Sequence, residues 1–230
     1  MTGVPGAGPR RTTWATLIIT GPPAAGKTTI RRAIRPLFDA LFDTYLDIGV
    51  DEVLRGMHRD GRLGTDGTIG QDGSLLLGGD WRRHVRLALV ELIRTRQEYD
   101  GPALIEAPTE AAWVVPFVQD RVLAMSSAIL YVKAPLEVRA ERNLHRASGR
   151  ISQANLLAMP SSLAPDNLAE VLQASRHVLF ADATLDVVST LAITEPFVRS
   201  YLDSLEAPLE QTAHRDRRAR GLPGMQVGEV

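Results

Sequence analysis

The chain has 230 residues, 44% of them hydrophobic, and its 26 basic and 27 acidic side chains give a formal charge of -1. This size allows one domain with a substantial core, and the neutral balance gives no electrostatic reason to expect nucleic acid or an anionic membrane as a partner. The absence of cysteine excludes a disulfide framework and thiolate metal sites, and it fits a cytoplasmic location.

The N-terminal residues 1–12 are rich in glycine and proline and predict a flexible segment. The following "RRTTWATLIIT" has the paired arginines of an export signal, but its apolar run is short and is followed by "GPPAAGKTT" without a small-residue cleavage pattern. We therefore interpret this run as a buried strand. No apolar run approaches ~20 residues, so no transmembrane helix is expected.

Apolar, β-favouring runs alternate with helical patterns along the rest of the chain. Because continuous apolar runs between helices are typical of parallel strands covered on both faces, they predict a three-layer α/β/α sandwich with about five parallel strands. The predicted strands are 14–20, 45–50, 102–107, 127–133 and 183–189. We expect one domain over residues 13–205 and a polar tail over 206–230.

Three helices are predicted between these strands. The first follows Lys27 and has a stripe of apolar residues, which Pro36 should kink or interrupt. The others cover residues 81–99 and 165–180. The stripes predicted to face the core are Ile30, Ile34, Leu37 and Leu41 in the first helix and Val85, Leu89, Leu92 and Ile93 in the second. The glycine-rich residues 60–81 predict a flexible loop or a hairpin.

The segment "GPPAAGKT" matches the phosphate-binding pattern G-x-x-x-x-G-K-[ST], with an apolar strand before it and a helix after it. Exposed amides at the start of the helix would bind phosphate, Lys27 would neutralise its oxygens, and the Thr28 hydroxyl would hold Mg²⁺. The predicted nucleotide-binding residues here are Gly21, Ala24, Ala25, Gly26, Lys27, Thr28 and Thr29. This pattern predicts a nucleoside triphosphate site, and the absence of N/T-K-x-D disfavours a GTPase.

The segment "DIGVDE" places three acids near the end of the second predicted strand. Ligands of such sheets bind at the carboxyl ends of the strands, so Asp51 is expected near the γ-phosphate, as a base that accepts a proton from an alcohol. Alternation along the strand would put Asp47 on the same face, deeper in the run. The structural alternative for Asp51 is a helix cap, because "DEVLRGM" can begin a helix there.

The segment "IGVDEVLRGM" resembles the "GVD" segment of the chloramphenicol phosphotransferases, which are kinases that phosphorylate an antibiotic hydroxyl group. The glycine-rich loop, "PALIEAP" and "ILYVKAPLEVRAERNLHRASGR" follow in the same order, so the likeness covers roughly residues 14–200. The resemblance implies that Asp51 is the catalytic base. It also implies a P-loop fold of the nucleotide-kinase type that uses ATP and Mg²⁺.

Arginines 139, 142, 146 and 150 follow the predicted strand 127–133 at steps that keep them on one helical face. They predict a lid that closes over the phosphates, unless they are a solvated face in an arginine-biased chain. The resemblance matches Arg142, Arg146 and Arg150 best, with Arg146 as a catalytic candidate. Glu106, at the end of the third predicted strand, either reaches Mg²⁺, orients the acceptor, or is an ordinary strand-end acid.

We therefore expect an ATP-dependent phosphotransferase acting on a hydroxyl of a small molecule. By resemblance the acceptor is an antibiotic or another secondary metabolite, in resistance or in biosynthesis. The alternatives are a polynucleotide 5′-hydroxyl kinase and a non-catalytic ATP-binding regulatory module. The five histidines are interpreted as structural or surface residues, and a homo-oligomer is compatible with the sequence.

Overall fold

The computed structural model describes residues 15–71, 73–108, 127–145, 156–157, 177–183 and 187–205. The expected N-terminal segment 1–12 and the tail 206–230 lie outside these residues. Among the described helices, none has the length and apolar character needed to cross a membrane.

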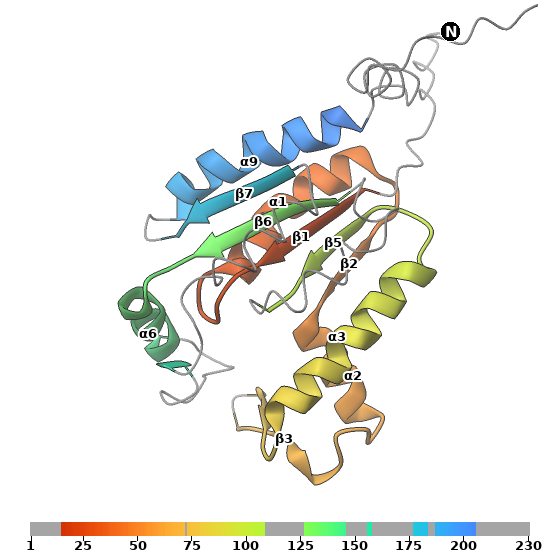
Figure 1. Ribbon diagram of the computed structural model, residues 1–230, viewed down its shortest axis with the longest axis vertical. Coiled ribbons are helices and arrows are strands. Elements are labelled where there is room, and N and C mark those ends of the chain that lie inside the picture. Colours follow the sequence, from red (N-terminus) through yellow and green to blue (C-terminus); the bar gives the residue numbers. More distant parts are fainter. Residues whose placement is uncertain are drawn as a thin grey trace, which may run out of the picture.

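A five-stranded, fully parallel sheet forms the centre of the molecule (Figure 1). Its strands, in spatial order, are β2 (Leu46–Gly49), β5 (Ala103–Glu106), β1 (Thr16–Thr20), β6 (Ser127–Lys133) and β7 (His177–Asp182). The predicted α/β class and the number of strands are thus confirmed, and the first β-strand lies at the centre of the sheet.

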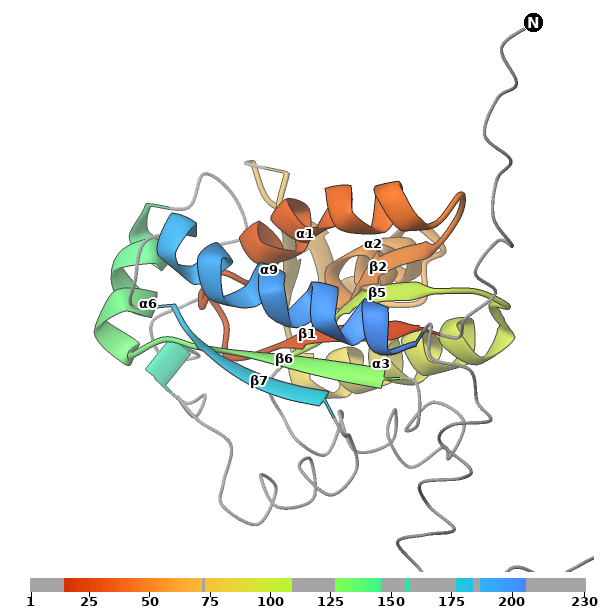
Figure 2. The same ribbon diagram turned by 90° about the horizontal axis from the view of Figure 1, so that it is seen from above.

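Helices cover both faces of this sheet, because alternate residues of its central strands are buried on opposite sides. Leu17 and Ile19 of β1 pack with α1 (Lys27–Leu41) and α9 (Val187–Ser204). Ile18 packs in a second core with α2 (Val50–Arg59) and α3 (Trp81–Glu98). Figure 2 shows α1 and α9 on one face and α3 on the other.

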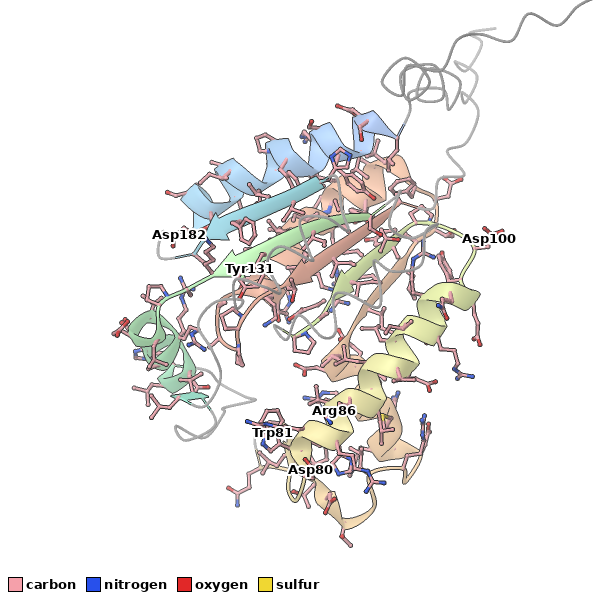
Figure 3. All side chains as sticks on the ribbon, viewed as in Figure 1. Asp80, Trp81, Arg86, Asp100, Tyr131 and Asp182 are labelled. Atoms are coloured by element: carbon pink, nitrogen blue, oxygen red, sulfur yellow. The ribbon has the colours of Figure 1, made fainter. Side chains whose placement is uncertain are left out.

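The fifth strand is not where the sequence placed it. β7 ends at Asp182, labelled in Figure 3, and the predicted strand 183–189 instead contains the first turn of α9. The predicted helix 165–180 is wrong over residues 177–180, which belong to β7, and its remainder lies outside the described residues. A short apolar run such as "HVLF" fits a strand or a helix equally well by periodicity, and pairing with β6 decides in favour of the strand.

The glycine-rich segment forms the predicted hairpin. After a short 3₁₀ turn, η1 (Gly64–Asp66), the strands β3 (Gly67–Ile69) and β4 (Leu75–Leu77) pair antiparallel. Asp80 then caps α3 by accepting a hydrogen bond from the amide of Arg83, 3.2 Å away, at the end of the helix nearest β3 (Figure 3). The buried His84 is hydrogen-bonded to Asp66 at 2.9 Å, which ties α3 to this segment and fits a structural role.

Helix α1 continues through Pro36 without a break, so the helix is not interrupted there as one of the two expectations for this proline required. Its buried residues are Ile30, Arg31, Ile34 and Phe38, while Leu37 and Leu41 are partly buried against the same core. Compared with the predicted stripe, the buried face of α1 is therefore shifted slightly toward Phe38, and it includes the charged residue Arg31.

Replacement of Pro36 with alanine is expected to stabilise the protein. Proline removes one helical hydrogen bond at a cost of about 3 kcal/mol, partly offset by about 1 kcal/mol through the stiffer unfolded chain. Chemical denaturation of Pro36→Ala should show a free energy of unfolding higher by roughly 2 kcal/mol. An unchanged or lower value would mean that the helix has already adapted to its proline.

Candidate functional site

The chain leaves β1 through a turn that only glycine can form. Gly21 has φ 146° and lies against β6, where a Cβ atom would stand 2.3 Å from the carbonyl oxygen of Val132. An L-residue at this position would meet both an unfavourable backbone conformation and a collision with another strand. Because glycine has no side chain, the start of the phosphate-binding loop can pass this close to β6.

The remainder of the loop presents its backbone to the front of α1. Ala24 and Gly26 have φ values of 60° and 105°, and such left-handed conformations turn successive amides toward a common point. Gly26 caps α1 without a side-chain hydrogen bond, and the first turn contains no acidic residue. The partial positive charge of the helix is thus available to an anion.

An open pocket of about 320 Å³ lies in front of this helix terminus. The ammonium group of Lys27 donates to the carbonyl oxygens of Gly21 and Pro22 at 2.8 and 3.0 Å, so it lies beside its own loop. The residues that line the pocket are Ala24 to Ile30, Glu106, Arg142, Ala183 and Thr190. Of the seven loop residues predicted to bind nucleotide, all but Gly21 line this pocket.

Glu106 is placed beside the loop by the parallel register. It pairs with Ile19 of β1 on one side and with Gly49 of β2 on the other. The hydroxyl of Thr28 donates to its Oε1 atom at 2.8 Å. A hydroxyl that donates its proton to a carboxylate turns its lone pairs outward, and hydroxyl and carboxylate oxygens are ligands that Mg²⁺ accepts. The pair Thr28 and Glu106 therefore fits the predicted metal site.

A buried arginine joins Glu106 to two acids of "DIGVDE". The Nε atom of Arg31 donates to Asp47 at 2.6 Å, and its Nη1 atom donates to Glu52 at 3.0 Å. The same Nη1 atom lies 3.5 Å from Oε2 of Glu106. Arg31 is only 2% exposed, and Arg35 also forms an ion pair with Asp47. One guanidinium thus contacts β2, α2 and β5.

The three carboxylates keep this arginine charged. Burial alone would lower the pKa of Arg31, but the hydrogen bond to Asp47 and the charges of Glu52, Asp47 and Glu106 outweigh burial and raise that pKa. A buried guanidinium with these partners is a permanent cation at the base of the site.

Asp51 is the acid of this segment that Arg31 does not bind. It is exposed in the first turn of α2, and no described residue forms an ion pair or hydrogen bond with its carboxylate. The helix cap is Gly49 and makes no side-chain hydrogen bond, so Asp51 does not have the capping role that was its structural alternative. The expected strand alternation between Asp47 and Asp51 is wrong, because β2 ends at Gly49.

Arg142 lines the pocket from helix α6 (Leu136–Leu144), which begins after Pro135 beyond the end of β6 (Figure 1). Its two terminal nitrogens donate to the carbonyl oxygens of Ala25, at 3.0 Å, and Ala183, at 2.6 Å. Arg142 therefore connects the phosphate-binding loop to the end of β7.

One other predicted lid arginine, Arg139, does not share this position. Arg139 is 1% exposed and does not line the pocket, and its Nε and Nη1 atoms have no hydrogen-bond partner in the part of the chain that the structure describes. Arg146 and Arg150 lie outside the described residues.

Arg31 is the site residue that sequence reasoning missed. A signal was present, because Arg31 stands three and seven residues before Ile34 and Phe38 and so falls within the buried stripe of α1. A charged residue in an apolar stripe, one turn after Lys27, indicates a buried ion pair.

The chain is similar to known proteins in sequence profile and in fold. The sequence profile of the family described as chloramphenicol phosphotransferase-like protein matches residues 15–191. No curated protein matches the chain.

Two similar solved structures are kinases by their descriptions. One is a sugar kinase from a Janibacter species, with 16% identity and a TM-score of 0.50, covering 80% of this chain and 94% of that one. The other is described as a putative kinase from Chloroflexus aurantiacus, with 18% identity and a TM-score of 0.50, covering 83% and 99%. At this identity the likeness establishes the fold, that of the P-loop kinases.

Substitution of Gly21 with alanine is expected to destabilise the protein by at least about 2 kcal/mol, because the new methyl group collides with the Val132 carbonyl in a strained backbone conformation. Gly56→Ala is the matched control. No heavy atom lies within 4 Å of its added methyl group, and in helix α2 it should stabilise by about 0.5–1 kcal/mol. Equal effects of the two substitutions on the free energy of unfolding would contradict the steric argument.

Proposed function

Since the chain belongs to the chloramphenicol phosphotransferase-like family, we propose that it is an ATP-dependent kinase that phosphorylates a hydroxyl group of a small molecule. The observation that carries this proposal is that the acids at the carboxyl ends of β2 and β5 differ in their contacts. Arg31 binds Asp47, Glu52 and Glu106, whereas Asp51 is exposed and unpaired among the described residues. A carboxylate in that condition is suited to accept a proton.

In this proposal the nucleotide phosphates bind the amides from Ala24 to Thr29. Lys27 moves from its loop carbonyls to the phosphate oxygens, and Arg142, already at the edge of the pocket, adds a second positive charge. Arg146 and Arg150 remain predicted contributors to the same phosphates, and Arg146 remains a predicted catalytic residue.

Thr28 and Glu106 would hold Mg²⁺, the former through its hydroxyl oxygen and the latter directly or through water. The ion supplies charge neutralisation on the phosphate oxygens when bound. The chain's own contribution is to fix those two oxygen ligands, which it does through their mutual hydrogen bond.

The transfer step forms a bond between the acceptor hydroxyl oxygen and the γ-phosphorus as the bond from that phosphorus to its bridging oxygen breaks. ADP leaves with the electron pair of the broken bond, and the hydroxyl proton passes to the Asp51 carboxylate. Lys27 and Arg142 stabilise the charge on the transferring group.

The acceptor that the family suggests is an antibiotic or related secondary metabolite, and the reaction would serve resistance or biosynthesis in the cytoplasm. A panel of hydroxylated antibiotics, sugars, nucleosides and 5′-hydroxyl oligonucleotides with labelled ATP tests this. Transfer to a small-molecule hydroxyl is the expected result. ATP binding without transfer to any of them would favour a regulatory module, and transfer to oligonucleotides alone would favour a polynucleotide kinase.

Asp51→Asn is expected to lower kcat about 10²-fold or more through loss of the general base, with ATP affinity nearly unchanged. Asp60→Asn is the matched control, because Asp60 is an exposed acid at the other end of the same helix. It should retain the wild-type kcat. Full activity of Asp51→Asn would remove Asp51 from the mechanism.

Thr28→Val is expected to weaken ATP binding only when Mg²⁺ is present, since the loop amides and Lys27 remain while the hydroxyl ligand is lost. Titration with a fluorescent ATP analogue, with Mg²⁺ and with EDTA, measures both affinities. In EDTA the variant should match the wild type within about twofold, as neither protein then uses the hydroxyl. Equal weakening in both conditions would point to a damaged loop and against a metal role for Thr28.

A further inference from the structure

We propose that Arg31 is a positioning residue for phosphoryl transfer, which fixes both the Glu106 carboxylate and the first turn of α2. This inference rests on the proposed function and adds to it a residue that touches neither phosphate nor acceptor in the scheme above. Its role is to hold in place the Glu106 carboxylate and the turn of α2 that carries Asp51, because the transfer occurs between these two groups in the proposed mechanism.

The geometry of the guanidinium supports this role. Its Nε atom is fixed by Asp47 of β2, 2.6 Å away, while Nη1 is shared between Glu52 of α2, at 3.0 Å, and Glu106 of β5, at 3.5 Å. The guanidinium is planar and rigid, so fixing one edge fixes the direction of the other nitrogens. Asp47, held also by Arg35, acts as the anchor from which Arg31 reaches the other two acids.

Each of those two acids adjoins a group assigned to the reaction. Glu106 receives the hydrogen bond of the Thr28 hydroxyl on its other oxygen, so Arg31 and Thr28 together fix both carboxylate oxygens. Glu52 directly follows the exposed Asp51 in the chain, and both acids lie in the first turn of α2. Arg31 therefore sets the position of the turn from which Asp51 projects.

Stability alone does not explain a buried arginine here. Burying an ion pair costs desolvation, and well-packed apolar side chains are often as stabilising at such positions. The neighbouring buried positions of the α1 stripe, Ile30 and Ile34, are apolar. A misplacement of about 1 Å in a reacting group can cost about 10²-fold in rate, so a rigid link between β5 and α2 has a functional consequence.

The test compares Arg31→Met with Arg32→Met, its exposed neighbour on the same helix. For each variant, kcat, the KM for ATP, and the Mg²⁺ concentration that half-saturates binding of a fluorescent ATP analogue are measured. Arg31→Met should lower kcat about 10- to 100-fold and raise the Mg²⁺ half-saturation concentration several-fold, with ATP-analogue affinity in EDTA unchanged. Arg32→Met should match the wild type in all of them.

Two further variants keep the proposal testable if Arg31→Met does not fold. Glu52→Gln leaves the contacts of Arg31 with Asp47 and Glu106, and it should lower kcat while the Mg²⁺ half-saturation concentration stays at the wild-type value. Arg31→Lys keeps the charge without the planar fork, and its kcat should lie between those of Arg31→Met and the wild type.

A merely structural role would lower the melting temperature of Arg31→Met and Glu52→Gln but leave kcat per nucleotide-binding site and the Mg²⁺ dependence unchanged, and that result would overturn the proposal. Failure of the proposed function would give a different result, in which the wild-type protein transfers phosphate to no acceptor. The Mg²⁺ dependence of nucleotide binding would still report whether Arg31 positions Glu106.

Discussion

The parallel hydrogen-bonding register of β2, β5 and β1 is the constraint on which the site depends. It sets Gly49, Glu106 and Ile19 side by side near the carboxyl edge of the sheet, where α2 follows β2 and the phosphate-binding loop follows β1. A slip of one residue would turn Glu106 to the opposite face. The contact between Thr28 and Glu106, on which the proposed metal site rests, exists only in this register.

Charge is arranged around that edge in a definite order. Arg31 lies beneath the surface and neutralises acids from three elements, while the start of α1 and Lys27 supply positive charge on the side of the pocket. The buried arginine binds the other acids, whereas Asp51 is exposed and accepts the proton in the proposed mechanism. The protein thereby separates carboxylates that hold the site together from the one proposed to react.

The fold was predictable in outline because its strands are buried on both faces and read as continuous apolar runs. The error at the fifth strand shows the limit of that signal. The runs 177–182 and 183–189 both contain β-branched or apolar residues, but the first pairs with β6, whereas the second contains the start of α9. Local propensity differs too little between two such runs to choose, and the choice is made by the free edge of the sheet.

The sequence by itself determined the phosphate-binding loop, since "GPPAAGKT" encodes its own backbone conformation through Gly21 and Gly26. It also singled out Asp51 among three neighbouring acids, by its place after a strand and by family likeness. Only the tertiary structure decided which acids are bound, because Arg31 meets partners that lie 16, 21 and 75 residues further along the chain. Such contacts depend on strand register and helix packing, which no local pattern of residues specifies.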